Sequence, residues 1–190
     1  KYNFYAVCVN PYYVPLCKAI LTGHNVKVAA VVGFPLGMNC TETKVQEAKT
    51  AVKYGAHELD IVMNIGAAKS GNWHFIEDET AAIMAASRKV VHKMIIETCL
   101  LSDKEKVAAA KAALVTGVFI KTSTGFGTKG AEVRDVKLLK KLVGDRAKIK
   151  ASGGIKTLAQ VLEFLEAGAS RIGTSAGVEI MRESMEKIHP

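Results

Sequence analysis

The stretch VFIKTSTG, residues 118–125, is a short apolar run that ends in a lysine and continues into a loop containing glycine. β-Branched and aromatic residues favour a buried strand, and the glycine favours a turn after it. Six further apolar runs recur along the chain, each separated from the next by enough residues for one helix. This alternation is typical of parallel strands joined by helical crossovers. The seven predicted strands are residues 4–10, 26–32, 58–64, 92–97, 118–122, 147–151 and 171–173.

The segments between these runs contain signals for helices. Ser102 stands three residues before Glu105, and Thr157 stands three residues before Gln160, which is the spacing of a capping box. Residues 133, 136, 139 and 143 are apolar and repeat at helical spacing, so this segment has one face to lay against a sheet. Glycines that suit the left-handed turn at the end of a helix occur just before three strands, at Gly55, Gly117 and Gly168.

Two α/β architectures accept this pattern, an open doubly wound sheet and a closed (β/α)8 TIM barrel. The open nucleotide-binding form would have a G-x-G-x-x-G turn after its first strand, whereas residues 10–13 read NPYY. We therefore expect the TIM barrel, as a single catalytic domain covering residues 1–190. Only seven of the eight units are visible, so we expect the first strand and helix to precede Lys1 and the barrel to be N-terminally incomplete.

Composition narrows the class of function. The net charge of +8 comes from lysines and arginines spread through the predicted helices, which favours an anionic small substrate over nucleic acid. No run approaches the roughly 18 apolar residues of a membrane span, so we expect a cytoplasmic protein without a membrane partner. The four cysteines form no C-x-x-C pair and the five histidines show no metal-ligand spacing, so we expect reduced thiols, no metal and no cofactor.

Charged residues near the ends of three predicted strands are the candidates for catalysis. Alternation along the strands turns Asp60, Lys121 and Lys150 toward the barrel interior, where barrel enzymes place their chemistry. Two ammonium groups on neighbouring strands repel each other in a partly dry site, so the cheaper state has one neutral amine. A neutral lysine is a nucleophile, although a single lysine at a strand end is more often a surface residue.

Three further residues that face inward have simpler explanations. Lys93 and Glu97 share one face of the run at 92–97, so we expect them to neutralise each other. Cys8 shares its strand face with Ala6 and Asn10, which favours a small buried side chain.

Glycines follow each of the last three predicted strands and indicate a phosphate site. Loops at this end of a barrel, together with a helix amino end, present free backbone amides to an anion. The candidate phosphate-binding residues are Gly125, Gly153, Gly154, Gly173 and Ser175.

Three stretches resemble one known family. ELDIVMNIG at 58–66, FIKTSTG at 119–125 and IKASGGI at 149–155 are similar to motifs of the deoxyribose-phosphate aldolases, as are VGFPLG at 32–37 and IIET at 95–98. The resemblance implies reversible cleavage of 2-deoxy-D-ribose 5-phosphate into D-glyceraldehyde 3-phosphate and acetaldehyde, without a metal or cofactor, in deoxyribonucleotide catabolism.

The resemblance also implies roles for individual residues. Lys121 would form the Schiff base, and Asp60 with Lys150 would transfer protons. Cys8 and Lys93 match residues that line the family's site, and with Thr124 they are our candidates for substrate binding.

The chain departs from the family in two places. It lacks the family's first strand with an Asp-His-Thr-like motif, and residues 186–190 lack the tail tyrosine of some members. The other hypotheses are a transaldolase-like or fructose-phosphate aldolase-like enzyme, an inactive barrel, and a basic nucleic-acid binder. We expect a homodimer or a higher homo-oligomer.

Overall fold

The seven strands predicted from the sequence all form, and they lie in one parallel sheet in the order of the chain. The computed structural model describes residues 2–188. The fold is α/β, as expected. The strands are β1 (Ala6–Val9), β2 (Lys27–Val32), β3 (Glu58–Val62), β4 (Val91–Ile95), β5 (Phe119–Lys121), β6 (Ile149–Ser152) and β7 (Arg171–Gly173).

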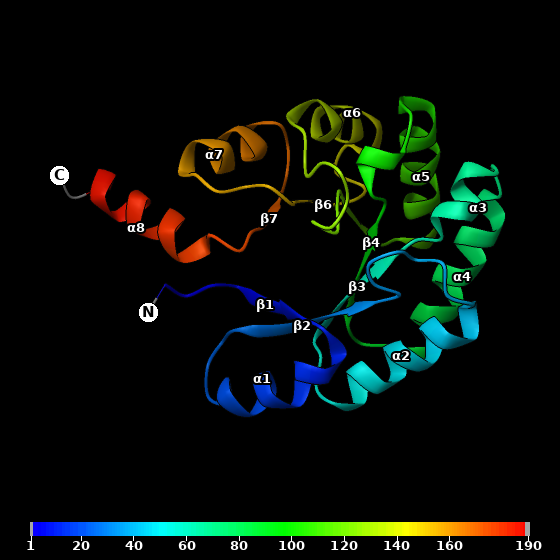
Figure 1. Ribbon diagram of the computed structural model, residues 1–190, viewed down its shortest axis with the longest axis horizontal. Helices are drawn as coiled ribbons and strands as arrows, with labels where there is room; N and C mark the ends of the chain where they lie inside the picture. Colours follow the sequence, from blue (N-terminus) through cyan, green and yellow to red (C-terminus); the bar gives the residue numbers. More distant parts are fainter. Residues whose placement is uncertain (1, 189–190) are drawn as a thin grey trace.

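Helices connect the strands and lie around the outside of the sheet, and the last helix follows the last strand and extends away from the sheet (Figure 1). They are α1 (Val14–Ile20), α2 (Thr41–Lys53), α3 (Ile65–Lys69), α4 (Trp73–Ala86), α5 (Asp103–Thr116), α6 (Val133–Val143), α7 (Leu158–Glu166) and α8 (Gly177–Ile188), with short 3-10 turns at Pro11–Tyr13 and Thr98–Leu100. Over residues 2–188, none of these helices has the length and apolar character needed to cross a bilayer.

The predicted helix ends are confirmed. Ser102 and Glu105 form a reciprocal capping box at the start of α5, and Thr157 and Gln160 form another at the start of α7. The three glycines expected to close helices, Gly55, Gly117 and Gly168, all have positive φ angles.

The sheet is curled into part of a barrel. Strands β3 and β6 stand three places apart, which would separate them by about 14 Å in a flat sheet. Asp60 of β3 nevertheless contacts Lys150 of β6 at 2.8 Å, and Glu58 of β3 contacts Arg171 of β7 at 2.6 Å. Side chains from distant strands therefore meet in the interior.

Alternation along the strands separates apolar packing from the charged interior, as predicted. Leu59 and Ile61 of β3 are buried in an apolar cluster with residues of α2 and α4, while Asp60 between them faces the interior. Ile149 of β6 joins a second cluster with residues of α5 and α6, while Lys150 faces inward. The helices thus cover one face of the sheet and leave the other for charged groups.

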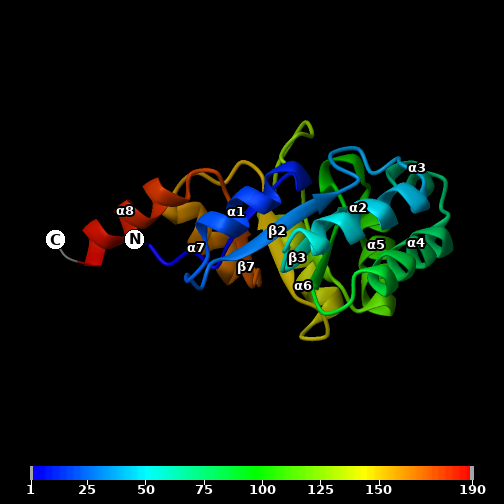
Figure 2. The same cartoon turned by 90° about the horizontal axis from the view of Figure 1, so that it is seen from below.

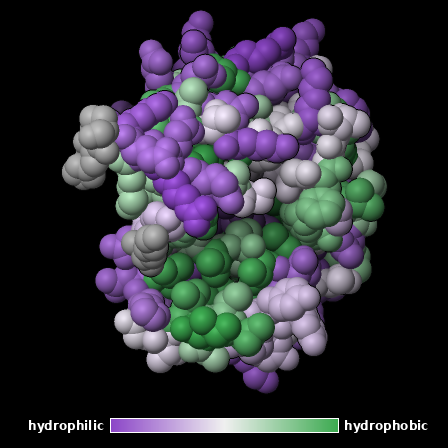
Figure 3. Space-filling model, turned by 60° about the vertical axis from the view of Figure 1, so that its left-hand side comes forward, coloured by the Kyte–Doolittle hydropathy of each residue, from purple (hydrophilic) through white to green (hydrophobic). Residues whose placement is uncertain are grey.

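The first and last strands are not paired with each other within the described residues, because the sheet runs from β1 to β7 without closing. A cavity of about 420 Å³ lies between these two strands. Figure 3 shows this side of the molecule with a hollow bordered by apolar residues. Figure 2 shows that α8 lies at one end of the molecule. The strand expected before Lys1 lies outside the described residues, as do His189 and Pro190 of the tail.

A buried ion pair ties α2 to α4 at the carboxyl end of the sheet. The Lys44 ammonium contacts the Glu79 carboxylate at 2.6 Å and donates to the carbonyl oxygen of Val62 at 2.9 Å. Both side chains are almost wholly buried, and the stem of Lys44 fills the space beside Gly33. This pair therefore fixes the positions of the loops that follow β2 and β3.

Replacing Lys44 by alanine tests this role. Lys44→Ala leaves the Glu79 carboxylate buried without its cation, so we expect the free energy of unfolding to fall by about 3–5 kcal/mol in urea titrations. Lys49→Ala, on the exposed side of the same helix, is the matched control and should change it by less than about 0.5 kcal/mol. Equal effects of the two substitutions would contradict the assignment.

Candidate active site

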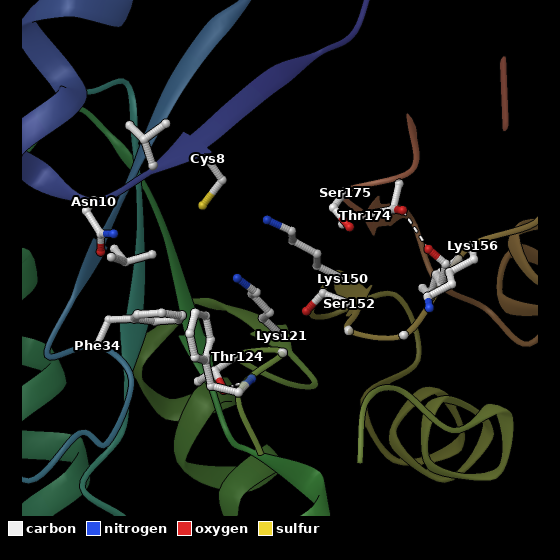
Figure 4. Close-up of a pocket in the computed structure, with 18 residues that line it drawn as sticks. Cys8, Asn10, Phe34, Lys121, Thr124, Lys150, Ser152, Lys156, Thr174 and Ser175 are labelled. Atoms are coloured by element: carbon white, nitrogen blue, oxygen red, sulfur yellow. Dashed lines mark hydrogen bonds between the residues drawn. The ribbon is translucent and has the colours of Figure 1, made fainter. Parts of the chain in front are cut away.

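Lys121 and Lys150 are direct neighbours across strands β5 and β6, where they pair in the register of the sheet. Both side chains point into the same cavity in Figure 4. Each is almost completely buried. Lys121 is the last residue of β5, and Lys150 follows Ile149 in β6. The prediction that these two lysines face each other on adjacent strands is therefore confirmed.

Asp60 joins the lysines from the opposite side of the interior. Its Oδ2 atom lies 2.8 Å from the Nζ atoms of both Lys121 and Lys150, and its Oδ1 atom lies 2.7 Å from Nζ of Lys93. The carboxylate itself is fully buried. One acid on β3 is thus shared among lysines on β4, β5 and β6.

The three ammonium groups determine the charge state of this acid. Burial alone would raise the pKa of Asp60, but Lys121, Lys150 and Lys93 outweigh it and hold this pKa well below its usual value. Burial alone would likewise lower the pKa of Lys150, but the Asp60 carboxylate outweighs it and raises this pKa. Asp60 is ionised and Lys150 is protonated at neutral pH.

The sequence predicted only repulsion between the ammonium groups of Lys121 and Lys150. In the structure Asp60 contacts both of them, so it offsets the repulsion and supplies a path between them through hydrogen bonds.

Lys93 lies beneath the cavity rather than on its wall. Its ammonium contacts Glu58 at 2.6 Å as well as Asp60, and Glu58 also binds Arg171 of β7. Lys93 and Arg171 lower the pKa of Glu58 against the effect of its burial. This chain of ion pairs supports Asp60 from below, and we assign Lys93 to holding Asp60.

The expected pairing of Lys93 with Glu97 is wrong. Glu97 follows the end of β4 with φ at 49°, which breaks the alternation of side chains along the strand. Its carboxylate instead accepts hydrogen bonds from the backbone amide and the hydroxyl of Thr124.

Cys8 lies on the wall of the cavity, so the expectation of a small buried side chain is wrong. It is exposed, and its thiol donates to Oδ2 of Asp60 at 3.6 Å. Across residues 2–188, we find no group of three or more histidine, cysteine or acidic side chains placed to hold a metal.

The cavity has a volume of about 480 Å³ and opens at the carboxyl ends of the strands. The predicted phosphate-binding residues all line it, together with Lys121, Lys150 and Thr124. Gly125 and Gly153 have positive φ angles, and a side chain on Gly153 would press against the backbone of Gly125 and Gly130. Glycine is therefore required where these loops touch.

Phe34, Phe126 and Lys156 are among the residues that line the cavity but were not predicted from the sequence. The rings of Phe34 and Phe126 meet edge to face with centroids 5.3 Å apart, and Figure 4 shows Phe34 on the side of the cavity away from Ser175. Lys156 is exposed beside the glycine loop after β6. Its position just after Gly153-Gly154-Ile155 was a usable signal, whereas nothing in the sequence pairs the two aromatic residues.

Comparison with known sequences gives one consistent result. A family model described as "DeoC/LacD family aldolase" matches residues 3–187. A deoxyribose-phosphate aldolase of Aciduliprofundum boonei is 52% identical over 99% of this chain and 86% of the relative. Another, from Thermococcus kodakarensis, is 53% identical over 95% of this chain and 83% of the relative.

Solved structures agree with the sequences. An aldolase called QR15 superposes with a TM-score of 0.95 and 45% identity over 98% of this chain and 84% of that protein. The deoxyribose phosphate aldolase of Aeropyrum pernix, described as tetrameric, gives a TM-score of 0.86 and 31% identity, covering 97% of this chain and 79% of that protein.

The depressed pKa of Asp60 predicts a specific dependence of stability on pH. A carboxylate whose pKa is lower in the folded state stabilises the fold above its unfolded pKa of about 3.9, and this stabilisation is lost as pH falls toward the folded pKa. Between about pH 5 and pH 3, the unfolding free energy of Asp60→Asn should fall less steeply than that of the unsubstituted protein. We expect the two slopes to differ by up to about 1.4 kcal/mol per pH unit. Urea titrations at each pH measure this slope.

Asp78→Asn is the matched control, because Asp78 is 69% exposed on α4 and contacts only a histidine among the described residues. The same slope in Asp60→Asn and the unsubstituted protein would contradict the assigned ionisation. Glu58→Gln provides a second test with the same measurement, because Lys93 and Arg171 lower the pKa of Glu58 against the effect of its burial. Its unfolding free energy should also fall less steeply with falling pH than that of the unsubstituted protein.

Proposed function

The chain belongs to the DeoC/LacD aldolase family, and we propose that it cleaves 2-deoxy-D-ribose 5-phosphate reversibly into D-glyceraldehyde 3-phosphate and acetaldehyde through a Schiff base on Lys121. The observation that carries this proposal is the position of the Lys121 amine, 2.8 Å from Asp60 and at the wall of a cavity bordered by glycine loops. The reaction class is that of an aldehyde lyase.

Formation of the Schiff base begins with addition of the neutral Lys121 amine to the aldehyde carbon of the substrate. The Lys121 ammonium first gives one proton to Asp60, which hydrogen-bonds both Lys121 and Lys150 at 2.8 Å. Asp60 later passes this proton to Lys150, once Lys150 has given up its own. Lys150, whose pKa is raised, then supplies the proton with which the hydroxyl of the carbinolamine leaves as water. A protonated imine on Lys121 results.

Carbon–carbon cleavage follows from the charge on this imine. The electron pair of the bond between the second and third sugar carbons moves toward the imine and forms an enamine. The hydroxyl on the third carbon loses its proton and becomes the aldehyde of D-glyceraldehyde 3-phosphate. Asp60, which is hydrogen-bonded to both Lys121 and Lys150, would receive this proton. Protonation and hydrolysis of the enamine release acetaldehyde and free Lys121.

The phosphate would bind at the far side of the cavity, where Gly125, Gly153, Gly154, Gly173 and Ser175 meet. Ser175 stands two residues before α8, whose amino end favours an anion, and Lys156 adds a positive charge. Binding energy at this end would hold the aldehyde of the substrate against Lys121.

We also propose that the enzyme is a homo-oligomer. The tetramer described for the Aeropyrum pernix aldolase supports assembly into a homo-oligomer. A cytoplasmic location and the absence of nucleic-acid partners remain predictions from the sequence.

Replacing Lys121 by leucine tests the proposed reaction. Lys121→Leu removes the amine but keeps an apolar stem in a buried position, so cleavage of 2-deoxy-D-ribose 5-phosphate should fall to background while circular dichroism stays native. Lys148→Leu, on the exposed residue two positions before Lys150, is the matched control and should retain activity. Cleavage by Lys121→Leu would exclude the proposed nucleophile.

Gly173 offers a separate test of the position of Lys150. A methyl group on Gly173 would stand 2.9 Å from both Cε of Lys150 and Cβ of Ser152, so Lys150 must move in Gly173→Ala. Displacement of a proton-transfer group by about 1 Å can cost about 100-fold in rate. We expect losses of this order both in sugar cleavage and in exchange of acetaldehyde methyl hydrogens with deuterated water.

Gly66→Ala is the control, because its methyl group would meet only the side-chain oxygen of Asn64, at 3.3 Å. If Gly173→Ala slowed cleavage of the phosphorylated sugar but left acetaldehyde exchange intact, Gly173 would serve the phosphate alone.

A further inference from the structure

Glu97 is a buried acid without a positively charged partner among residues 2–188. Its side chain is 3% exposed, and its carboxylate accepts from the Thr124 amide at 3.3 Å, from the Thr124 hydroxyl, and from the Cys99 thiol at 3.9 Å. Burial of a carboxylate is costly unless donors satisfy it. Its closest donors belong to Thr124, on the loop that borders the cavity, so this acid acts on that loop.

The backbone around Glu97 is fixed to strand β5. Glu97 has a φ angle of 49°, in the left-handed region that residues other than glycine seldom adopt. The amide of Ile96 donates to the carbonyl of Lys121 at 3.0 Å, and the amide of Thr98 donates to the carbonyl of Thr122 at 2.9 Å. These bonds hold the carboxylate under the loop that begins after Lys121.

The hydroxyl of Thr124 consequently has its proton directed to one fixed partner. A hydroxyl has one proton to donate and two lone pairs that accept. The proton is directed to Glu97, whose carboxyl oxygens accept from both the hydroxyl and the amide of Thr124, and the amide of Phe126 occupies one lone pair at 3.0 Å. Thr124 lines the cavity that contains Lys121 (Figure 4). Its hydroxyl can therefore accept one more hydrogen bond from a ligand but cannot donate one.

An acceptor of this kind suits a substrate hydroxyl that keeps its proton throughout the reaction. The hydroxyl on the third sugar carbon loses its proton during cleavage and must face proton-carrying groups, which are Asp60 and Lys150. The hydroxyl on the fourth carbon does not react and is free to donate to Thr124. In the reverse reaction, acetaldehyde condenses with a second aldehyde, the acceptor aldehyde. The hydroxyl in question is then on the carbon next to the aldehyde carbon of this acceptor aldehyde.

We infer that Glu97 is a positioning residue that fixes the Thr124 hydroxyl as an acceptor, and thereby makes the enzyme prefer acceptor aldehydes with a hydroxyl on the neighbouring carbon. This inference rests on the proposed aldolase function and names a determinant of its specificity. Glu97 itself does not touch the substrate.

The test compares two acceptors in the condensation with acetaldehyde. Lactaldehyde has the neighbouring hydroxyl, and propanal lacks it while keeping the same carbon chain. The measured quantity is the ratio of kcat/KM for lactaldehyde to kcat/KM for propanal. Loss of one hydrogen bond to the substrate corresponds to about a tenfold fall in this ratio.

Two substitutions should lower the ratio by different routes. Thr124→Val removes the hydroxyl at nearly constant shape. Glu97→Gln keeps the hydroxyl, but its amide can donate to the Thr124 oxygen and turn the proton of that hydroxyl toward the cavity. We expect each variant to lower the ratio about tenfold, and Thr124→Ser, which keeps the hydroxyl, to preserve it. Thr128→Val, an exposed residue in the same loop, is the control and should leave the ratio unchanged.

Exchange of acetaldehyde methyl hydrogens with deuterated water separates this inference from the proposed function. Exchange requires the imine and the enamine but no acceptor, so its absence in the unsubstituted enzyme would refute the Lys121 mechanism itself. With exchange present, an unchanged ratio in Thr124→Val would overturn the inference, even if Glu97→Gln did not fold. A lowered ratio in Thr124→Val with an unchanged one in folded Glu97→Gln would also overturn it.

Discussion

One fully buried carboxylate, Asp60, contacts lysines from three different strands, and the arrangement of the barrel interior depends on it. Three ammonium groups buried together would repel one another strongly without it. Curling of the sheet is what brings β3 within 2.8 Å of side chains on β5 and β6. The same contact that balances the buried charge therefore also selects the curled sheet and places an amine at the cavity wall.

Charged groups at the amino ends of the strands and loops at their carboxyl ends surround Asp60 and the lysines. Arg171, Glu58 and Lys93 form a continuous chain of ion pairs that ends on Asp60, so the carboxylate is held from the amino ends of the strands. At the carboxyl ends, Gly125 and Gly153 allow two loops to touch beside the lysines. Charge and loop contact thus border the cavity of about 480 Å³ that Lys121 and Lys150 line.

The sequence predicted what depends on local alternation. Apolar residues on both sides of Asp60 and Ile149 before Lys150 were enough to assign their inward direction, and the strands, capping boxes and helix-ending glycines followed from local chemistry. Glu97 was misassigned because its left-handed backbone turns the side chain toward another loop. The contact of Phe34 with Phe126 depends on two loops far apart in sequence, which no local pattern encodes.

Trapping the imine would identify which lysine is the nucleophile. Borohydride would be added to the enzyme with 2-deoxy-D-ribose 5-phosphate, and the reduced protein would be digested and mapped by mass spectrometry. If Lys121 is the nucleophile, we expect one stable adduct, on the peptide that contains Lys121. An adduct on Lys150 or Lys93 instead, or no adduct in an enzyme that still cleaves the sugar, would contradict it.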